Sequence, residues 1–247
     1  MLRVELEPAF ILHHRPFRDT SVLLEIFSQA HGRVGLVARG ARGPRSRWRA
    51  VLHPFRPLLL SWQLRGELGT LTGAESGAES GARFGGESGS VATMAPSKGD
   101  ALLALYYVNE LLLRLTARLD PHSELFAVYG RVVATLMAGE PVAPALRRFE
   151  KRLLDTLGYG PELERDATGQ AIDGAASYRY DPSLGLASCR PDAPGALLGA
   201  SLQALAAEQL VEARALADAR RLLRAALEVH LDGRPLKTRE MLTRLRR

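Results

Sequence analysis

The chain has 247 residues, of which 46% are apolar and 24% charged, a composition typical of a globular protein and unlike that of a disordered or membrane-embedded chain. At about 150 residues per domain, this length predicts one large or two small domains. The 33 Lys and Arg residues against 27 Asp and Glu residues give a net charge of +6, which favours a polyanionic partner such as nucleic acid or an acidic protein surface.

The first 73 residues predict five short strands, each rich in Val, Leu, Ile or Phe and separated by turn residues. Five strands with one long connection after the third are typical of a small closed barrel of the OB type, although an SH3-like barrel has a similar pattern. We therefore expect a nucleic-acid-binding domain at 1–73. Its predicted strands are 4–13, 20–27, 33–38, 57–63 and 67–71.

Positive charge is concentrated in two segments. Residues 26–66 hold eight arginines and no Asp or Glu, and 220–247 carry a net charge of +6, which leaves −8 on the rest of the chain. An arginine-rich face can simply be solvated, but a long stretch without one acid has few partners for internal salt bridges. The first segment is therefore the stronger candidate for a polyanion-binding surface.

The connection at 38–49 brings together arginines and an indole, and its Gly and Pro residues are expected to keep it extended. Guanidinium groups bind phosphates bidentately, and Trp48 offers a face on which a base can stack, a combination that suits single-stranded nucleic acid. Alternatively, Trp48 closes the barrel core. With Arg33 and two cations of the C-terminal segment, the DNA-binding candidates are Arg33, Arg39, Arg42, Arg45, Arg47, Trp48, Arg49, Lys237 and Arg239.

Residues 74–98 are predicted to be a flexible linker, because Ala-Glu-Ser-Gly occurs twice and Gly-Glu-Ser-Gly once. A phosphate-binding loop is excluded here, since the Lys-Ser/Thr ending is missing and the glutamates would repel phosphate. From 99 to 247 the period becomes helical, around an irregular insert at 158–197 with one short hairpin. We expect a capping box at Ser97 and Asp100, and helices near 97–119, 120–139, 144–157 and 200–230.

A last short helix is predicted to begin at Thr238 and to bury Met241, Leu242 and Leu245. The fold class is therefore α+β, an N-terminal barrel followed by a helical domain. The longest apolar run falls short of the roughly 20 residues that span a bilayer, so no membrane segment is expected.

No catalytic motif is found in the sequence, so we do not expect an enzyme. The one cysteine, Cys189, has no partner for a disulfide, and the N-terminus lacks the apolar core of a signal peptide, which predicts a cytoplasmic protein. The sequence also lacks pairs of Cys or His residues at the spacing typical of metal ligands, so neither a metal nor a cofactor is expected.

Ten short segments, spread over nearly the whole chain, form an ordered pattern. They are AFIL at 9–12, RPFRDTS at 15–21, HGRV at 31–34, ARGAR at 38–42, PFRPL at 54–58, GEL at 66–68, YVNELL at 107–112, LRRFE at 146–150, LGYG at 157–160 and PLKTRE at 235–240. In the order and spacing of these segments the chain resembles the bacterial RecO recombination mediators. The resemblance implies an OB domain, a helical domain, no enzymatic activity and a role in repair by the RecF pathway.

Members of this family bind single- and double-stranded DNA, anneal complementary strands, contact the acidic tail of single-strand binding protein, and act with RecR to load RecA. We therefore expect these partners here, in a cytoplasmic protein associated with the nucleoid. For the acidic tail, the candidates form the basic side of the helix at 144–157: Arg147, Arg148, Lys151 and Arg152. A solvated basic face would look the same.

This chain departs from the family at a motif of four cysteines that binds zinc in many members. Asp166, Gly169 and Asp192 stand where three of those cysteines would be, and only Cys189 remains, so zinc is not carried over. Two other functions remain open from the sequence: a scaffold that recognises an acidic protein through its arginines, and an OB protein directed to RNA.

Overall fold

The computed structural model describes residues 1–77, 99–231 and 233–245, so that the predicted linker from 78 onward and the predicted cap at Ser97 lie outside the described residues. The chain divides into two compact units, of which the first comprises Met1–Gly139 together with Leu236–Arg247 and the second Glu140–Pro235. The first unit thus combines the barrel with the first two helices and the last one, whereas the predicted boundary lies between the barrel and all helices.

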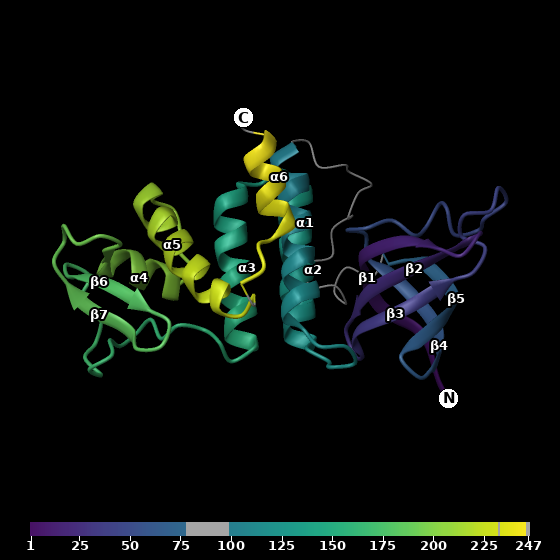
Figure 1. Ribbon diagram of the computed structural model, residues 1–247, viewed down its shortest axis with the longest axis horizontal. Coiled ribbons are helices and arrows are strands. Elements are labelled where there is room, and N and C mark those ends of the chain that lie inside the picture. Colours follow the sequence, from purple (N-terminus) through teal and green to yellow (C-terminus); the bar gives the residue numbers. More distant parts are fainter. Residues whose placement is uncertain (78–98, 232, 246–247) are drawn as a thin grey trace. The chain divides into compact units, whose positions relative to one another are not determined.

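Five strands of the first unit form a closed barrel in the order β1, β2, β3, β5, β4 (Figure 1). The 16-residue β1 serves two neighbours, because its residues 2–9 pair with β4 and its residues 9–17 pair with β2. Parallel pairing of β3 with β5 closes the barrel. The predicted OB-type barrel is confirmed, with strands β1 Leu2–Phe17, β2 Ser21–Ser28, β3 Gly32–Ala38, β4 Leu58–Arg65 and β5 Leu68–Ser76.

The barrel interior is filled by alternate residues of these strands, since successive side chains of a strand point to opposite faces. Ile11, Leu36, Leu60 and Trp62 are completely buried there. The strand β5 continues through Ser76, into the first residues of the predicted linker, because Leu58 of β4 pairs with Ser76 at its far end.

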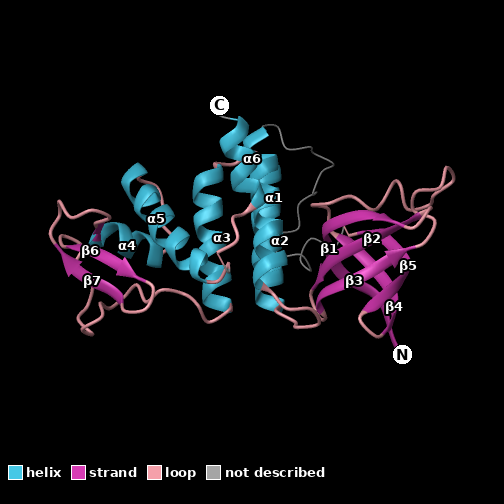
Figure 2. Cartoon of the chain, in the orientation of Figure 1, coloured by secondary structure: helices cyan, strands magenta, loops and turns pink. Residues whose placement is uncertain are grey.

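Two helices of the first unit follow, α1 Gly99–Leu115 and α2 Ser123–Met137 (Figure 2). The predicted first helix is four residues too long, since the chain leaves the helix at Thr116 and Arg118 forms a bridge with Arg33 of β3. Asp120 is also not the cap of α2, which begins after His122 with no capping bond from a side chain.

The outer face of the barrel packs on α2 through aromatic rings. Phe10 of β1 lies edge-on to Tyr129 with centroids 4.9 Å apart, and Phe27 of β2 lies 5.7 Å from Phe126. Within this apolar contact the Asn109 side chain of α1 donates to the Leu12 carbonyl at 2.8 Å and accepts from the Tyr129 hydroxyl at 2.7 Å. Burial raises the pKa of that hydroxyl, so it remains a donor.

The last helix, α6 Lys237–Leu245, belongs to the same unit. Its first turn is held by the carboxylate of Glu110 on α1, which accepts from the Lys237 and Thr238 amides at 2.8 and 3.0 Å and from the Thr238 hydroxyl at 2.7 Å. The predicted helix is confirmed, but Met241 is 54% exposed and not buried, while the side chains of Leu242 and Leu245 lie outside the described residues.

The second unit is built from helices and a three-stranded sheet in the order β7, β6, β8. The predicted hairpin in the irregular insert is confirmed, and β8 adds a third strand that the sequence pattern did not indicate. No helix among the described residues of either unit is long and apolar enough to cross a membrane. The elements are α3 Val142–Thr156, β6 Ser177–Asp181, β7 Gly185–Cys189, β8 Leu197–Leu198, α4 Gly199–Ala206 and α5 Ala213–Val229.

Replacement of Gly32 by Ala tests the contact between the barrel and the α1–α2 connection. A Cβ atom at Gly32 would lie 2.0 Å from the carbonyl oxygen of Asp120, and the backbone has a φ of +64°. Gly66 has a similar φ of +70° but open space around it. Gly66→Ala is therefore expected to cost only about 1–2 kcal/mol, the penalty of a left-handed backbone for a residue with a Cβ atom. We expect Gly32→Ala to lower the free energy of unfolding in urea clearly more than Gly66→Ala does. Equal losses would contradict this contact.

Candidate nucleic-acid interface

The connection between β3 and β4 carries the arginines singled out by the sequence. Arg39, Arg42, Arg45, Arg47 and Arg49 are all exposed. Within the part of the chain that the structure describes, none of the five forms an ion pair with an Asp or Glu. Like charges that lack acidic partners repel one another, so an anionic ligand would relieve this repulsion.

The backbone of this connection is a series of turns and not the extended loop expected from its Gly and Pro residues. The amide of Gly43 donates to the Gly40 carbonyl and that of Ser46 to the Gly43 carbonyl, each at 3.1 Å. The Arg42 amide bonds the Thr20 carbonyl at 2.8 Å. We call residues 39–49 the arginine loop; its turns present guanidinium groups from a backbone anchored to the β1–β2 turn.

Trp48 is buried, with an exposed fraction of 6%, and belongs to the core of the barrel. Its indole N–H donates to the Arg39 carbonyl at 3.0 Å, and the Arg47 guanidinium lies 4.2 Å from the centre of its ring. Of the two roles considered from the sequence, the geometry therefore supports closure of the barrel core and leaves little ring surface for a base.

Arg33 lies apart from the arginine loop and has partners within the first unit. Its guanidinium donates to the carbonyls of Leu112 and Leu113 at the end of α1 and lies 3.9 Å from the Glu25 carboxylate. Burial lowers the pKa of this guanidinium. Because these contacts hold α1 against β3, we leave Arg33 out of the proposed interface.

Lys237 and Arg239 lie in the first turn of α6, close to β1 and α1. The Lys237 side chain is exposed, and the Arg239 guanidinium lies 6.0 Å from the centre of the Tyr107 ring. The sequence did not single out Arg18, which lies in the β1–β2 turn, where its carbonyl accepts from the Arg42 guanidinium at 3.5 Å. Only the folded turn brings Arg18 beside the loop.

The basic side of α3 in the second unit is largely occupied by acidic neighbours. Arg147, expected on the exposed side, is instead buried and pairs with the carboxylate of Glu150 at 2.6 Å. The other three residues lie near Glu208. Arg148 donates to its backbone carbonyl at 3.1 Å, and Arg152 pairs with its carboxylate. Lys151 lies 3.8 Å from that carboxylate but pairs more closely with Asp155, at 2.8 Å.

Asp166 and Asp192, which stand where the family resemblance would place zinc-binding cysteines, have other contacts here. The Asp166 carboxylate accepts from the amides of Thr168 and Gln170, and the Thr168 hydroxyl lowers the pKa of that carboxyl most. Asp192 pairs with Arg190 at 3.5 Å. Among the described residues, no three His, Cys, Asp or Glu side chains gather as metal ligands.

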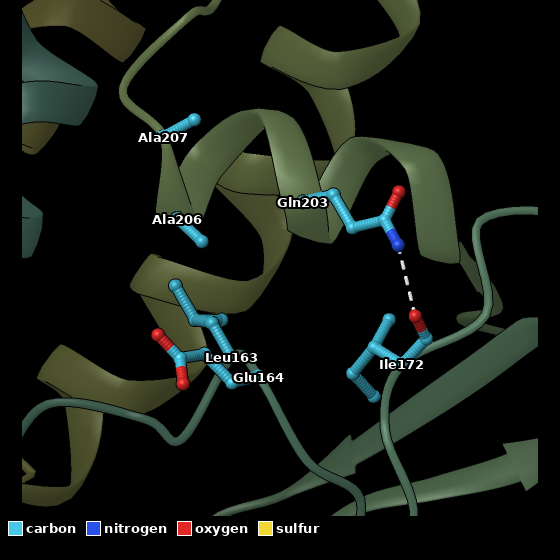
Figure 3. A pocket seen from close by; sticks show the side chains of 6 residues that line it. All are labelled: Leu163, Glu164, Ile172, Gln203, Ala206 and Ala207. Carbon is cyan, nitrogen blue, oxygen red and sulfur yellow. Dashed lines mark hydrogen bonds between the residues drawn. The ribbon is translucent and has the colours of Figure 1, made fainter.

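A cleft of about 450 Å³ lies in the second unit (Figure 3). Its walls are mostly apolar, and the Gln203 amide already donates to the Ile172 carbonyl at 2.8 Å. A cleft of this kind lacks the several convergent polar groups that orient a small molecule. The residues that line it are Leu163, Glu164, Ile172, Gln203, Ala206 and Ala207.

An N-terminal OB-type barrel with a basic loop, joined to helices, defines a class of α+β proteins built on a fold that commonly presents nucleic-acid-binding loops. The family descriptions Recombination protein O N terminal and Recombination protein O C terminal match residues 1–78 and 96–240. The chain belongs to the Recombination protein O family, and the two matches leave residues 79–95 between them.

Curated relatives agree with this assignment. The chain is 44% identical to the DNA repair protein RecO of Alkalilimnicola ehrlichii over 99% of its own length and 93% of the relative. It is 42% identical to the proteins of the same name from Azoarcus sp., over 98% and 97% of the two lengths, and from Nitrosococcus oceani, over 100% and 96%.

Substitution of Trp48 distinguishes a core residue from a stacking platform. Because the indole is packed in the barrel, we expect Trp48→Ala to lower the free energy of unfolding by about 3–5 kcal/mol. Trp48→Phe keeps most of the packing and loses mainly the hydrogen bond to Arg39, for a cost of about 1–2 kcal/mol. Chemical denaturation measures both values, and an alanine variant as stable as the unaltered protein would contradict the core position.

Proposed function

We propose that this protein is a DNA repair and recombination mediator that binds single- and double-stranded DNA through the arginine loop. The observation that carries this proposal is the set of five exposed arginines on one loop, none paired with an acid that the structure describes. The relatives named DNA repair protein RecO support the same role.

The chemistry of the loop suits contact with phosphates more than with base edges. Guanidinium groups pair bidentately with phosphate oxygens whatever the base sequence. Two complementary strands repel each other through their phosphates, and a protein that neutralises phosphates while leaving the bases accessible promotes their pairing. Strand annealing is therefore part of the proposal, and no catalytic step is needed for it.

The proposal includes three protein partners of the family. In it, the protein acts with RecR to load RecA onto DNA that is coated by single-strand binding protein, in the cytoplasm and at the nucleoid. The acidic tail of single-strand binding protein would bind to the basic side of α3, where its carboxylates would replace that of Glu208 beside Lys151 and Arg152, with Arg148 next to them.

The triple variant Arg39→Glu, Arg42→Glu, Arg45→Glu tests the loop. We expect it to abolish measurable binding to a fluorescent single-stranded oligonucleotide and to abolish annealing, while thermal unfolding stays close to that of the unaltered protein. If the loop neutralises about five phosphates, the unaltered protein should show a slope of log affinity against log salt of about −3.5. Anisotropy titrations over a salt series give both quantities.

A second triple variant, Arg131→Glu, Arg179→Glu and Arg190→Glu, is the matched control, because it changes the net charge equally at exposed arginines elsewhere. It should keep most of the affinity. Equal affinity of the loop variant and the unaltered protein at moderate salt would overturn the assignment. An unaltered protein that binds no DNA directly would favour a scaffold for an acidic protein, and tighter binding of matched RNA would favour an RNA-directed role.

Glu208→Gln tests the partner surface on α3. The change removes the carboxylate next to Lys151 and Arg152, and ion pairs at a protein surface contribute about 0.2–1 kcal/mol each. We expect a peptide with the sequence of the acidic tail to bind about three- to tenfold more tightly to this variant, as measured by anisotropy. Glu212→Gln, at an exposed position nearby in the chain, should leave the affinity unchanged. No gain with Glu208→Gln would contradict this surface.

A further inference from the structure

The second half of β1 has a neighbouring strand on one side only. Beyond Ala9, β1 pairs only with β2 among the described residues, because its pairing with β4 ends there. The Leu12 carbonyl, at a shift in the β1–β2 register, accepts from Asn109, and the side chains of residues 13–16 are exposed. Pro16 has no amide hydrogen and Arg15 is charged, so this edge is unsuited to the addition of another strand.

The exposed side chains at this edge are basic. His13 and Arg15 are two residues apart on β1, opposite Glu25 and Leu23 of β2, so they share the outer face of the sheet. The carboxylate of Glu25 is engaged by Arg33 and Arg118 and therefore does little to offset these cations. The structure describes no ion pair of Arg15.

One end of this edge lies beside α6. Asn109 bonds β1 at Leu12, and the next residue of α1, Glu110, holds the Lys237 amide. Lys237 also acts on His13 electrostatically. Partial burial of the imidazole lowers the pKa of His13 most, and His14, Arg15 and Lys237 lower it further, while Glu25 raises it. The charged groups of β1, β2 and α6 around His13 thus sum to an excess of positive charge.

The other end of the edge reaches the arginine loop. Arg18 follows β1 directly, and its carbonyl and that of Thr20 accept hydrogen bonds from Arg42. From His13 to Arg18 the chain spans about 17 Å at roughly 3.3 Å per residue. Along the helix axis, one strand of B-form DNA rises about 3.4 Å per nucleotide, so this distance corresponds to the axial rise of about five nucleotides.

We propose that the DNA path continues from the arginine loop along β1 to the first turn of α6, with Arg18, Arg15, His13 and Lys237 as a second set of phosphate contacts. We call these four residues the β1 strip. The proposal rests on the proposed function, since it extends a path that begins at the arginine loop.

Because His13 is titratable, DNA binding along the β1 strip should depend on pH, which contacts from arginines alone would not cause. A phosphate beside His13 raises the pKa of its imidazole, so binding takes up a proton. The affinity for DNA therefore rises as the pH falls through the pKa of His13 in the complex. It becomes constant below the pKa of His13 in the free protein, which lies under the ordinary value of 6.5. His13→Gln removes this part of the pH dependence.

The experiment uses the whole protein and the double variant Arg15→Glu, Lys237→Glu. Two fewer phosphate contacts should reduce the magnitude of the salt slope on a long single-stranded oligonucleotide by about 1.4, with an affinity loss of about tenfold or more. An oligonucleotide of about five nucleotides, long enough only for the arginine loop, should lose much less. The neutral pair Arg15→Gln, Lys237→Gln gives the same pattern in a milder form if the charge reversal unfolds the protein.

The control is Arg131→Glu with Arg179→Glu, which should leave the long oligonucleotide bound as before. Equal affinities of the strip variants and this control would overturn the β1 path, as would an equal loss on short and long oligonucleotides. Binding that depends on the arginine loop but not on the strip would defeat only this inference, whereas binding that survives the loop variant would defeat the proposed function itself. Proton uptake that is the same in His13→Gln would remove His13 from the path.

Discussion

The arrangement of the first unit depends on one hydrogen-bonding requirement, that a buried backbone carbonyl at an irregularity of β1 be satisfied. The register of β1 against β2 shifts between Ile11 and His13, so Leu12 has no partner residue in β2, and its buried carbonyl accepts from Asn109 instead. A buried carbonyl without a partner costs about 1–3 kcal/mol, and Tyr129 holds the amide in the orientation that meets it. This bond fixes where α1 crosses β1, and through Glu110 it also fixes the first turn of α6.

Arginine has opposite environments in the two units. In the arginine loop the guanidinium groups are exposed and face no described acid, whereas on α3 almost every cation has a carboxylate or carbonyl within reach. The first arrangement is electrostatically unfavourable by itself and becomes favourable with a polyanion. The second arrangement is already neutralised, so a partner there must compete with Glu208. The two surfaces therefore differ in how much of their charge is available.

The barrel could be predicted from the sequence because its strands alternate and end at recognisable turns, such as His31-Gly32. The ends of α1 and α2 could not, since Arg118 and Asp120 are recruited by β3 through long-range contacts that no local pattern encodes. The exposed arginines of the loop followed from the lack of acids around them. Burial of Trp48 and Arg147 depends on tertiary packing, and both look like surface residues in a run of arginines.

The first unit is discontinuous in sequence, because α6 returns to α1 only after the whole of Glu140–Pro235 has been made. At about 5–20 residues per second, a ribosome needs roughly 5–20 seconds for a segment of this length. During that interval the nascent chain already contains the barrel, α1 and α2, but α6, whose first turn the Glu110 carboxylate binds, has not yet been synthesised. The surface that joins β1 to α6 is consequently the last part of this unit to be completed during biosynthesis.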